Sequence, residues 1–292
     1  MIGLWYSAYL QEMHIKYEKF MEIEEHTAQT AQVFNTVANG YDREALRFFP
    51  FCADKMLDIL TPQPGWQLLD IATGTGQAAI AAARLIQPNG RVQGIDISQR
   101  MLDQAANNIQ QSTLANIDLH EMDAMALEFG NDSFDAAMCA FGVFFMPDMQ
   151  AALRGWKRSL KPGAKLIFSS FTDQSFLPMI DDFMRRMSEI SDFEPDAFVN
   201  LETEQACHSL LQSAGYENIN IQTHNMGYYL RNADEWWEVV WNTALRGPLM
   251  ALPADTLATF RAEHLAAVSE MENENGLWLN VDVIFSSAEC TQ

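Results

Sequence analysis

The sequence of 292 residues predicts an α/β fold with a doubly wound, mostly parallel sheet. One observation behind this prediction is that short apolar runs alternate with helix-length amphipathic segments between Gln67 and Phe171. A second is that the apolar runs are nearly continuous, which is typical of strands covered by helices on both faces. Right-handed crossovers make the doubly wound order the expected one for such an alternation.

Within this region the pattern predicts five strands and three helices. The predicted strands are "WQLLDIA", "RVQGIDI", "NIDLHEM", "FDAAMCAF" and "AKLIFSSF". The predicted helices are "QAAIAAARLI", "QRMLDQAANNIQQS" and "DMQAALRGWKRSL". Ser98 is expected to cap the second helix, and the sequence Lys161-Pro162-Gly163 is expected to end the third.

The flanking segments are predicted to complete a seven-stranded, Rossmann-like sheet. Residues 1–60 are predicted to form a helical N-terminal segment, and residues 61–171 the core. Residues 172–292 are predicted to hold helical cap insertions together with the last two strands, "YENINIQTHNMGYYL" and "GLWLNVDVIFSS".

The composition predicts a globular protein of the cytoplasm. Hydrophobic residues make up 48% of the chain, and no apolar run reaches the roughly 20 residues that a membrane helix needs. The N-terminus shows no basic leader with a cleavage site, and the cysteines form no CxxC pair. A net charge of −21 argues against nucleic acid as a partner. The scattered His and Cys residues predict no metal site.

The stretch "LLDIATGTGQAAIAA" predicts a ligand-binding loop at the end of the first strand. Gly74 and Gly76 allow a tight turn with the backbone close to a ligand, and the following helix offers free N–H groups. The spacing Gly74-x-Gly76-x-x-Ala79 also fits a dinucleotide-binding loop. On the glycines alone, a nicotinamide-dependent oxidoreductase therefore remains an alternative.

Three aspartates follow successive strands and narrow the choice of ligand. Asp70 lies in the end of the first strand, where a buried carboxylate needs a donor or a cationic ligand group. Asp96 follows Gly76 by twenty residues and is placed to accept both hydroxyls of a ribose. Asp123 and Ala124 are placed to read the edge of an adenine. This set favours an adenosine that carries an amino acid over a pyrophosphate.

With these residues the chain resembles the class I S-adenosylmethionine-dependent methyltransferases, in the branch of the ubiquinone and menaquinone biosynthesis enzymes. The resemblance runs in order from about Phe34 to Ile221. It rests on the segments "FNTVANGYD", "LLDIATGTGQAA", "GIDISQRMLDQA", "MDAMALEFGNDSFDAAMCAFGVFFMPDMQAALRGWKRSLKPGAKLIFSSF" and "SAGYENINI".

The resemblance implies S-adenosyl-L-methionine as the cofactor and a set of residues that bind it. Asp70 and the glycine loop would hold the methionine end, Asp96 the ribose diol, and Asp123 the adenine edge. Ala140 and Phe141 would pass beside the sulfonium. The implied set is Tyr41, Asp70, Ala72, Thr73, Gly74, Thr75, Gly76, Asp96, Ile97, Met101, Asp123, Ala124, Ala140 and Phe141.

Two departures from the family pattern concern the loop and the acceptor. Ala72 replaces the usual first glycine, which is expected to be tolerated if its φ angle is negative. Phe144 and Phe145 stand where quinone-pathway members carry a polar pair, so the particular substrate of those enzymes does not carry over directly.

The tail has a Trp-rich helix that the quinone enzymes lack. Two interpretations of Trp236, Trp237 and Trp241 stay open: they line an acceptor pocket, or they form the core of a helical cap. Helical aromatic spacing more often means packing, which favours the second interpretation.

The predicted activity is methyl transfer from S-adenosylmethionine to a small, apolar or aromatic acceptor. A base is needed only where the acceptor must lose a proton, and the candidates are His224, His120 and Tyr41. No acid is visibly paired with any of them, so no catalytic residue is assigned. A non-catalytic S-adenosylmethionine-binding module remains a further alternative.

Overall fold

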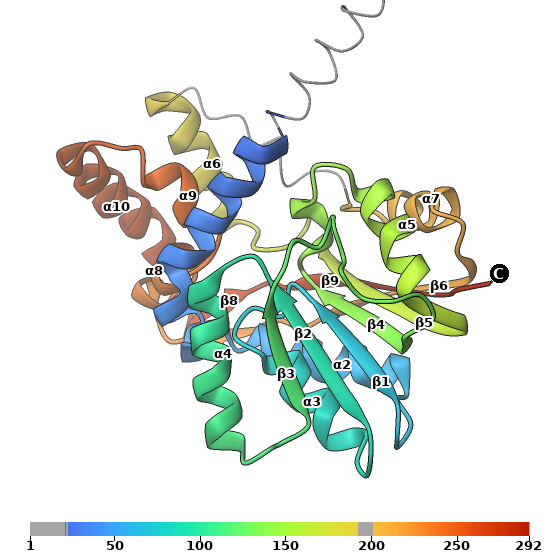
Figure 1. The fold of residues 1–292 in the computed structure, drawn as a ribbon. Coiled ribbons are helices and arrows are strands. Elements are labelled where there is room, and N and C mark those ends of the chain that lie inside the picture. Colours follow the sequence, from blue (N-terminus) through green and yellow to red (C-terminus); the bar gives the residue numbers. More distant parts are fainter. Residues whose placement is uncertain (1–20, 22, 192–200, 292) are drawn as a thin grey trace, which may run out of the picture.

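The computed structural model of the chain describes residues 21, 23–191 and 201–291. Its centre is a seven-stranded sheet with the order β3-β2-β1-β4-β5-β9-β6 (Figure 1). Only β9 runs antiparallel to its neighbours within this sheet, so the prediction of a doubly wound, mostly parallel, seven-stranded sheet is confirmed. The strands are β1 (Gln67–Ile71), β2 (Arg91–Asp96), β3 (Ile117–Glu121), β4 (Phe134–Ala140), β5 (Leu160–Phe171), β6 (Glu217–Asn225) and β9 (Asp282–Glu289).

Helices cover both faces of the sheet, as the apolar strands require. One face carries α2 (Phe48–Leu60), α3 (Gln77–Leu85) and α4 (Gln99–Ser112). The other carries α5 (Met149–Ser159) and α7 (Glu204–Ser213). The expected cap of α4 is present, because the Ser98 hydroxyl accepts a hydrogen bond from the Met101 N–H at 3.2 Å. The two separate buried clusters on these faces supply the hydrophobic energy that holds the layers together.

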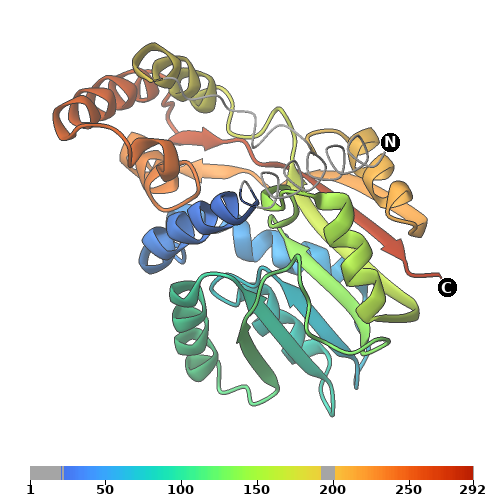
Figure 2. The same cartoon turned by 45° about the horizontal axis from the view of Figure 1, so that its top comes forward.

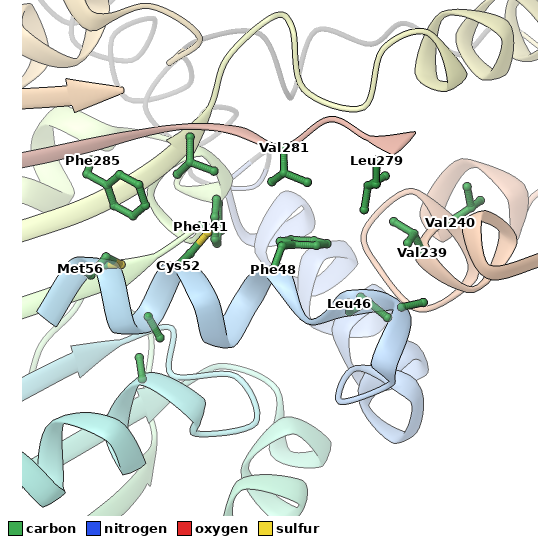
Figure 3. Close-up of a cluster of buried hydrophobic side chains, with 14 of the residues drawn as sticks. Leu46, Phe48, Cys52, Met56, Phe141, Val239, Val240, Leu279, Val281 and Phe285 are labelled. Atoms are coloured by element: carbon green, nitrogen blue, oxygen red, sulfur yellow. The ribbon is translucent and has the colours of Figure 1, made fainter. Parts of the chain in front are cut away.

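The cluster on the α2 face continues beyond the sheet into the cap (Figure 3). Phe48, Cys52 and Met56 project from α2 toward Phe285 of β9 and the neighbouring segment, and all four are fully buried. Phe141 enters the same cluster from the end of β4. The packing around α2 thus connects the sheet directly to the residues that follow β4.

Two segments predicted as continuous strands are each divided in two. The first breaks after β6 and resumes as β7 (Tyr228–Leu230), and the second forms β8 (Leu277–Leu279) before β9. β7 and β8 pair as a separate antiparallel ribbon. At the break a Cβ on Gly227 would lie 2.5 Å from the Leu279 carbonyl oxygen, so only glycine allows this close backbone approach.

The ribbon carries a helical cap above the carboxyl ends of the strands (Figures 1 and 2). The cap is built from α6 (Met179–Ile190), α8 (Ala233–Trp241), α9 (Arg246–Leu249) and α10 (Ala254–Ser269). A buried polar network joins three of these helices. The Trp236 indole N–H donates to His264 Nε2 at 2.8 Å, and His264 Nδ1 lies 2.7 Å from Asp182 Oδ2.

The N-terminal segment runs between the cap and the sheet (Figure 2). It is helical over residues 23–37 and continues as η1 (Ala38–Gly40) and η2 (Glu44–Leu46). Gly40 contacts the cap so closely that a Cβ there would lie 1.8 Å from Asn242 Oδ1. The part of the helical prediction that covers residues 1–20 and 22 lies outside the described residues. The proposed division at residues 60 and 171 stays a prediction.

Candidate cofactor and acceptor site

A cavity of about 90 Å³ opens at the carboxyl ends of β1, β2 and β4. This is the edge at which open α/β sheets bind ligands. The cavity brings together most of the residues that the sequence predicted for the cofactor. Those lining it are Tyr41, Ala72, Gly74, Asp96, Ile97, Met101, Asp123, Ala124, Ala140 and Phe141.

A second cavity, of about 180 Å³, extends from the first along the glycine loop. It adds the predicted residues Asp70, Thr73 and Thr75, and the two cavities share Tyr41, Ala72, Gly74 and Ala140. Gly76 lines neither cavity. It instead ends the turn before α3 with φ +81°, where a Cβ would lie 3.2 Å from the Ala105 Cβ. Its role is to let α3 pack against α4.

Asp70 is a buried carboxylate, and one of its two oxygens accepts no hydrogen bond from the described residues. Its Oδ2 accepts a 2.6 Å hydrogen bond from the Thr73 hydroxyl, whereas Oδ1 has no partner among the described residues. Burial raises the pKa of Asp70 to about 7, although the Thr73 bond opposes this shift. An unpaired, buried carboxylate oxygen beside a cavity fits a cationic group, such as the ammonium of an amino acid.

Asp96 ends β2 and holds the glycine loop in place. Its Oδ2 accepts from the Gly74 N–H and its Oδ1 from the Ser98 N–H, both at 2.8 Å. Burial raises the pKa of this carboxyl to about 6, and the backbone N–H groups of Ser98, Gly74 and Ile97 lower it. Each carboxylate oxygen keeps a second lone pair, so the same group can also accept from a ribose diol. The sequence did not indicate the contact with Gly74.

The condition on which Ala72 was expected to be tolerated, a negative φ, is not met. Ala72 and Phe141 both have φ of +54°, in the left-handed region, at the ends of the adjacent strands β1 and β4. Such a backbone costs a non-glycine residue about 1–2 kcal/mol. A Cβ on Gly142 would lie 2.8 Å from the Ala72 Cβ, so the two loops are in tight contact. Ala72 and Phe141 both line the first cavity. Strained backbone of this kind is often found at functional sites.

The N-terminal segment is fastened to the glycine loop by Asp42, which sequence reasoning missed. Asp42 accepts from the Thr75 hydroxyl at 2.6 Å and from the Asn108 amide at 2.8 Å. The preceding Tyr41 stacks on Phe49, with ring centroids 4.6 Å apart. The motif "NGYD" carries Asp42, but its partner Thr75 is too distant in the sequence to be inferred from spacing.

A third cavity, of about 280 Å³, lies next to the cofactor cavity and under the cap. The two share Phe34, Tyr41, Phe141 and Phe145. From the cap side, Ile180 and further aliphatic side chains complete its wall. The aromatic side chains that line it are Phe34, Tyr41, Phe48, Phe49, Phe141, Phe144, Phe145, Phe171 and Phe176.

The three tryptophans of the Trp-rich helix do not line this cavity, so the interpretation that they form the acceptor pocket is wrong. Trp236 and Trp237 are buried, and Trp237 stacks on Trp241 with centroids 5.8 Å apart. These rings form the core of the cap, as helical spacing favoured. The same segment reaches the cavity with smaller residues instead, at Val239 and over residues 243–245.

None of the candidate bases is suited to take a proton in this cavity. His224 and His120 line none of the three cavities. Tyr41 lines all three, but burial and the nearby carboxylates raise its pKa well above the ordinary value, so its phenol stays protonated. Sequence reasoning also missed three carboxylates of the third cavity, Asp173, Asp181 and Glu202, because they lie in no recognisable motif.

Within residues 21, 23–191 and 201–291, no group of three or more His, Cys, Asp or Glu side chains is arranged to hold a metal ion. In the same part of the chain, no helix has both the length and the apolar character needed to cross a membrane.

The sheet order and the cavity at its carboxyl edge are those of the class I S-adenosylmethionine-dependent methyltransferases, and comparison with known proteins agrees. The model of the ubiE/COQ5 methyltransferase family matches residues 21–231, and the chain belongs to this family. The predicted enzyme class and cofactor are confirmed. Neither the oxidoreductase nor the non-catalytic module finds support among the relatives.

Two relatives illustrate how far the similarity extends. The chain is 29% identical over 222 residues to the aklanonic acid methyltransferase DauC of Streptomyces sp. strain C5, covering 71% of this chain and 100% of that protein. It is 32% identical over 139 residues to the demethylmenaquinone methyltransferase of Listeria welshimeri, covering 46% of this chain. The match spans 59% of the length of the Listeria protein.

Solved structures show the same fold at low sequence identity. The YcgJ protein of Bacillus subtilis has a TM-score of 0.58 at 19% identity, covering 83% of this chain and 99% of that one. The [4+2]-cyclase SpnF has a TM-score of 0.56 at 20% identity, covering 83% of this chain and 81% of that one. Because the fold also occurs in a protein described as a cyclase, the acceptor chemistry must be argued from the site.

Proposed function

We propose that the enzyme transfers the methyl group of S-adenosylmethionine to a small aromatic acceptor bound in the third cavity. The observation that carries this proposal is the aromatic lining of that cavity and its shared wall with the cofactor cavity. Phe141 lines both cavities, and it stacks on Phe171 of the third cavity with ring centroids 4.3 Å apart. A flat acceptor packed against these rings would lie beside the reactive end of the cofactor.

In this proposal the cofactor is held by residues at three strand ends. The unpaired Oδ1 of Asp70 would accept a hydrogen bond from the methionine ammonium, and Asp96 would accept from the ribose diol. Asp123 and Ala124 contact the adenine edge, with Ile97 and Met101 along one face of the ring. When bound, S-adenosylmethionine supplies a methyl group that is already a strong electrophile.

The work left to the protein is alignment and exclusion of water. Tyr41, Phe141 and Phe145 line both cavities, and their apolar surfaces would exclude water from the region where the cavities meet. Holding the acceptor in line at near-attack distance supplies about 7–11 kcal/mol of the barrier reduction. No protein base is needed unless the acceptor must lose a proton, which agrees with the linings of the three cavities, where the described residues include no histidine.

The relatives support an acceptor with an apolar ring system. One is named for demethylmenaquinone and the other for aklanonic acid. Phe144 and Phe145 line the cavity in this chain, where the quinone-pathway enzymes carry a polar pair. We therefore propose the class, a quinone-like or polyketide-like ring, without transferring either named substrate. The cytoplasmic location and the lack of a nucleic-acid partner stay predictions.

A labelled-methyl assay tests the proposal. The full chain is incubated with S-adenosylmethionine carrying a tritiated methyl group and with fractionated metabolite extract, and labelled products are identified by mass spectrometry. The expected product is an aromatic small molecule, and Ala244→Trp, which fills the third cavity, should abolish its formation while S-adenosylhomocysteine still binds. Equal labelling by Ala244→Trp, or labelling of non-aromatic metabolites alone, would contradict the proposal.

A further inference from the structure

The acceptor cavity has a marked charge asymmetry. Asp173 and Asp181 line it from the segment that follows β5, and Glu202 lines it from the residues before α7. Among the described residues that line this cavity there is no lysine, arginine or histidine. The remaining wall consists of aromatic and aliphatic side chains with a few hydroxyl groups. One edge of an otherwise apolar cavity, where Asp173 and Asp181 are exposed to solvent, is therefore acidic.

None of these carboxylates is held in an ion pair by a described residue, although Asp173 Oδ1 accepts a hydrogen bond from the Gln174 side-chain amide at 3.1 Å. On α6, Asp182 is bonded by Arg185 and Arg186, at 2.5 and 2.7 Å. The adjacent Asp181 makes no ion pair within the described part of the chain, and neither do Asp173 and Glu202. The two arginines of α6 therefore pair with Asp182 and not with Asp181. The side of the helix that faces the cavity keeps the negative charge of Asp181.

The carboxylates also repel one another. Burial raises the pKa of Glu202 above its usual range, and the charge of Asp173 raises it further. A positive group placed between them would relieve this repulsion and gain charge-assisted hydrogen bonds. A negative group there would meet like charges with no compensating cation in the lining. The net charge of −21 acts in the same direction on an approaching ligand.

We propose that this cavity prefers an aromatic acceptor carrying a protonated amine, which would face Asp173, Asp181 and Glu202, over an aromatic carboxylate. In this preference the chain would differ from the relative that is named for aklanonic acid. The aromatic rings of the wall assist, because a cation near the face of a ring is stabilised. The inference rests on the proposed function, since it takes the third cavity as the acceptor site. It adds the charge of the acceptor and the residues that recognise this charge.

Three matched fluorescent probes test the inference: 2-naphthylmethylammonium, 2-naphthylmethanol and 2-naphthoate. They share one ring and differ in charge, and each is titrated into the full chain saturated with S-adenosylhomocysteine. The ammonium probe should bind at least about tenfold more tightly than naphthoate, a ratio that corresponds to about 1.4 kcal/mol. The alcohol should bind with intermediate affinity.

Variants of the cavity residues test whether these residues cause the preference for the ammonium probe over naphthoate. The double variant Asp181→Asn with Glu202→Gln should reduce the ammonium-to-naphthoate ratio to below about threefold, without changing affinity for S-adenosylhomocysteine. A matched control, Glu270→Gln with Glu274→Gln, removes two carboxylates that line none of the three cavities and should leave the ratio unchanged. Ala244→Trp should weaken all three probes together.

The outcomes separate this inference from the proposed function. If all probes bind and Ala244→Trp weakens them, but naphthoate binds as tightly as the ammonium probe, only the charge preference is overturned. An unchanged ratio in the Asp181 and Glu202 variant also overturns it. If no probe binds while S-adenosylhomocysteine does, the cavity does not take aromatic acceptors, and the proposed function falls together with the inference.

Discussion

Asp96→Ala offers the most direct test of the cofactor site, because this one carboxylate is assigned both to the ribose and to the loop. It is buried at the end of β2 and lines the first cavity. In the structure its oxygens already accept from the Gly74 and Ser98 N–H groups. The substitution removes any bond to the ribose diol together with these two loop contacts.

Both effects have magnitudes that can be measured. Loss of a hydrogen bond to a charged acceptor costs about 1.5–3 kcal/mol, which weakens affinity for S-adenosylhomocysteine roughly 10- to 150-fold. The two backbone N–H groups lose their acceptor, so the free energy of unfolding should fall by about 1–3 kcal/mol. Isothermal titration calorimetry measures the first effect, and urea denaturation the second.

Two controls separate the ribose contact from a general disturbance. Asp118→Ala removes an exposed carboxylate of the neighbouring strand, paired with Arg91, and should leave cofactor affinity unchanged. Asp96→Ala should weaken adenosine but not 2′,3′-dideoxyadenosine, which lacks the diol. Equal losses on both nucleosides would show that the loop carries the effect. Unchanged affinity in a folded variant would refute the assignment of Asp96 altogether.

Three further changes test other parts of the structure. Burial raises the pKa of Asp70 to about 7, and only the ionised form attracts an ammonium. Calorimetric affinity for S-adenosylhomocysteine should therefore rise from about pH 6 to about pH 8, and a rise of the same size in Asp70→Asn would contradict its role. His264→Phe leaves the Trp236 N–H without an acceptor and should lower the free energy of unfolding by about 1–3 kcal/mol, seen by urea denaturation. Burial lowers the pKa of His264 below its unfolded value near 6.5, so the wild-type chain should lose stability as the pH falls below about 6.5, and His264→Phe should lose less. Ala72→Gly relieves a left-handed alanine and should raise the unfolding free energy by up to about 1 kcal/mol, and a loss would indicate that the methyl packs favourably.

The elements that sequence periodicity predicted well are those determined by local pattern and by burial on both faces. The core strands and helices fall close to their predicted bounds, and Ser98 caps α4 as its side-chain chemistry indicates. The cofactor cavity was accessible to the same reasoning, because the ends of parallel strands converge at one edge of the sheet. Asp70, Asp96 and Asp123 could therefore be grouped without knowledge of the fold's details.

The acceptor cavity could not be predicted in this way. Its wall joins Phe34, Phe141, Phe176 and Val239, which meet only after the cap has packed over the N-terminal segment. No spacing in the sequence encodes such contacts. Backbone conformation was equally inaccessible at Ala72, because the family glycine signals a left-handed turn and its replacement conceals one.

The shared wall of the cavities would couple the proposed cofactor and acceptor sites. Tyr41 lines all three cavities and stacks on Phe49, and the adjacent Asp42 accepts from Thr75 in the glycine loop. The acceptor cavity is consequently complete only when the N-terminal segment rests on that loop. Because a bound cofactor would contact the same loop, it would favour this resting position, and the acceptor would then bind to a surface that the cofactor has helped to order. Tyr41 is thus placed to contact both the cofactor and the acceptor.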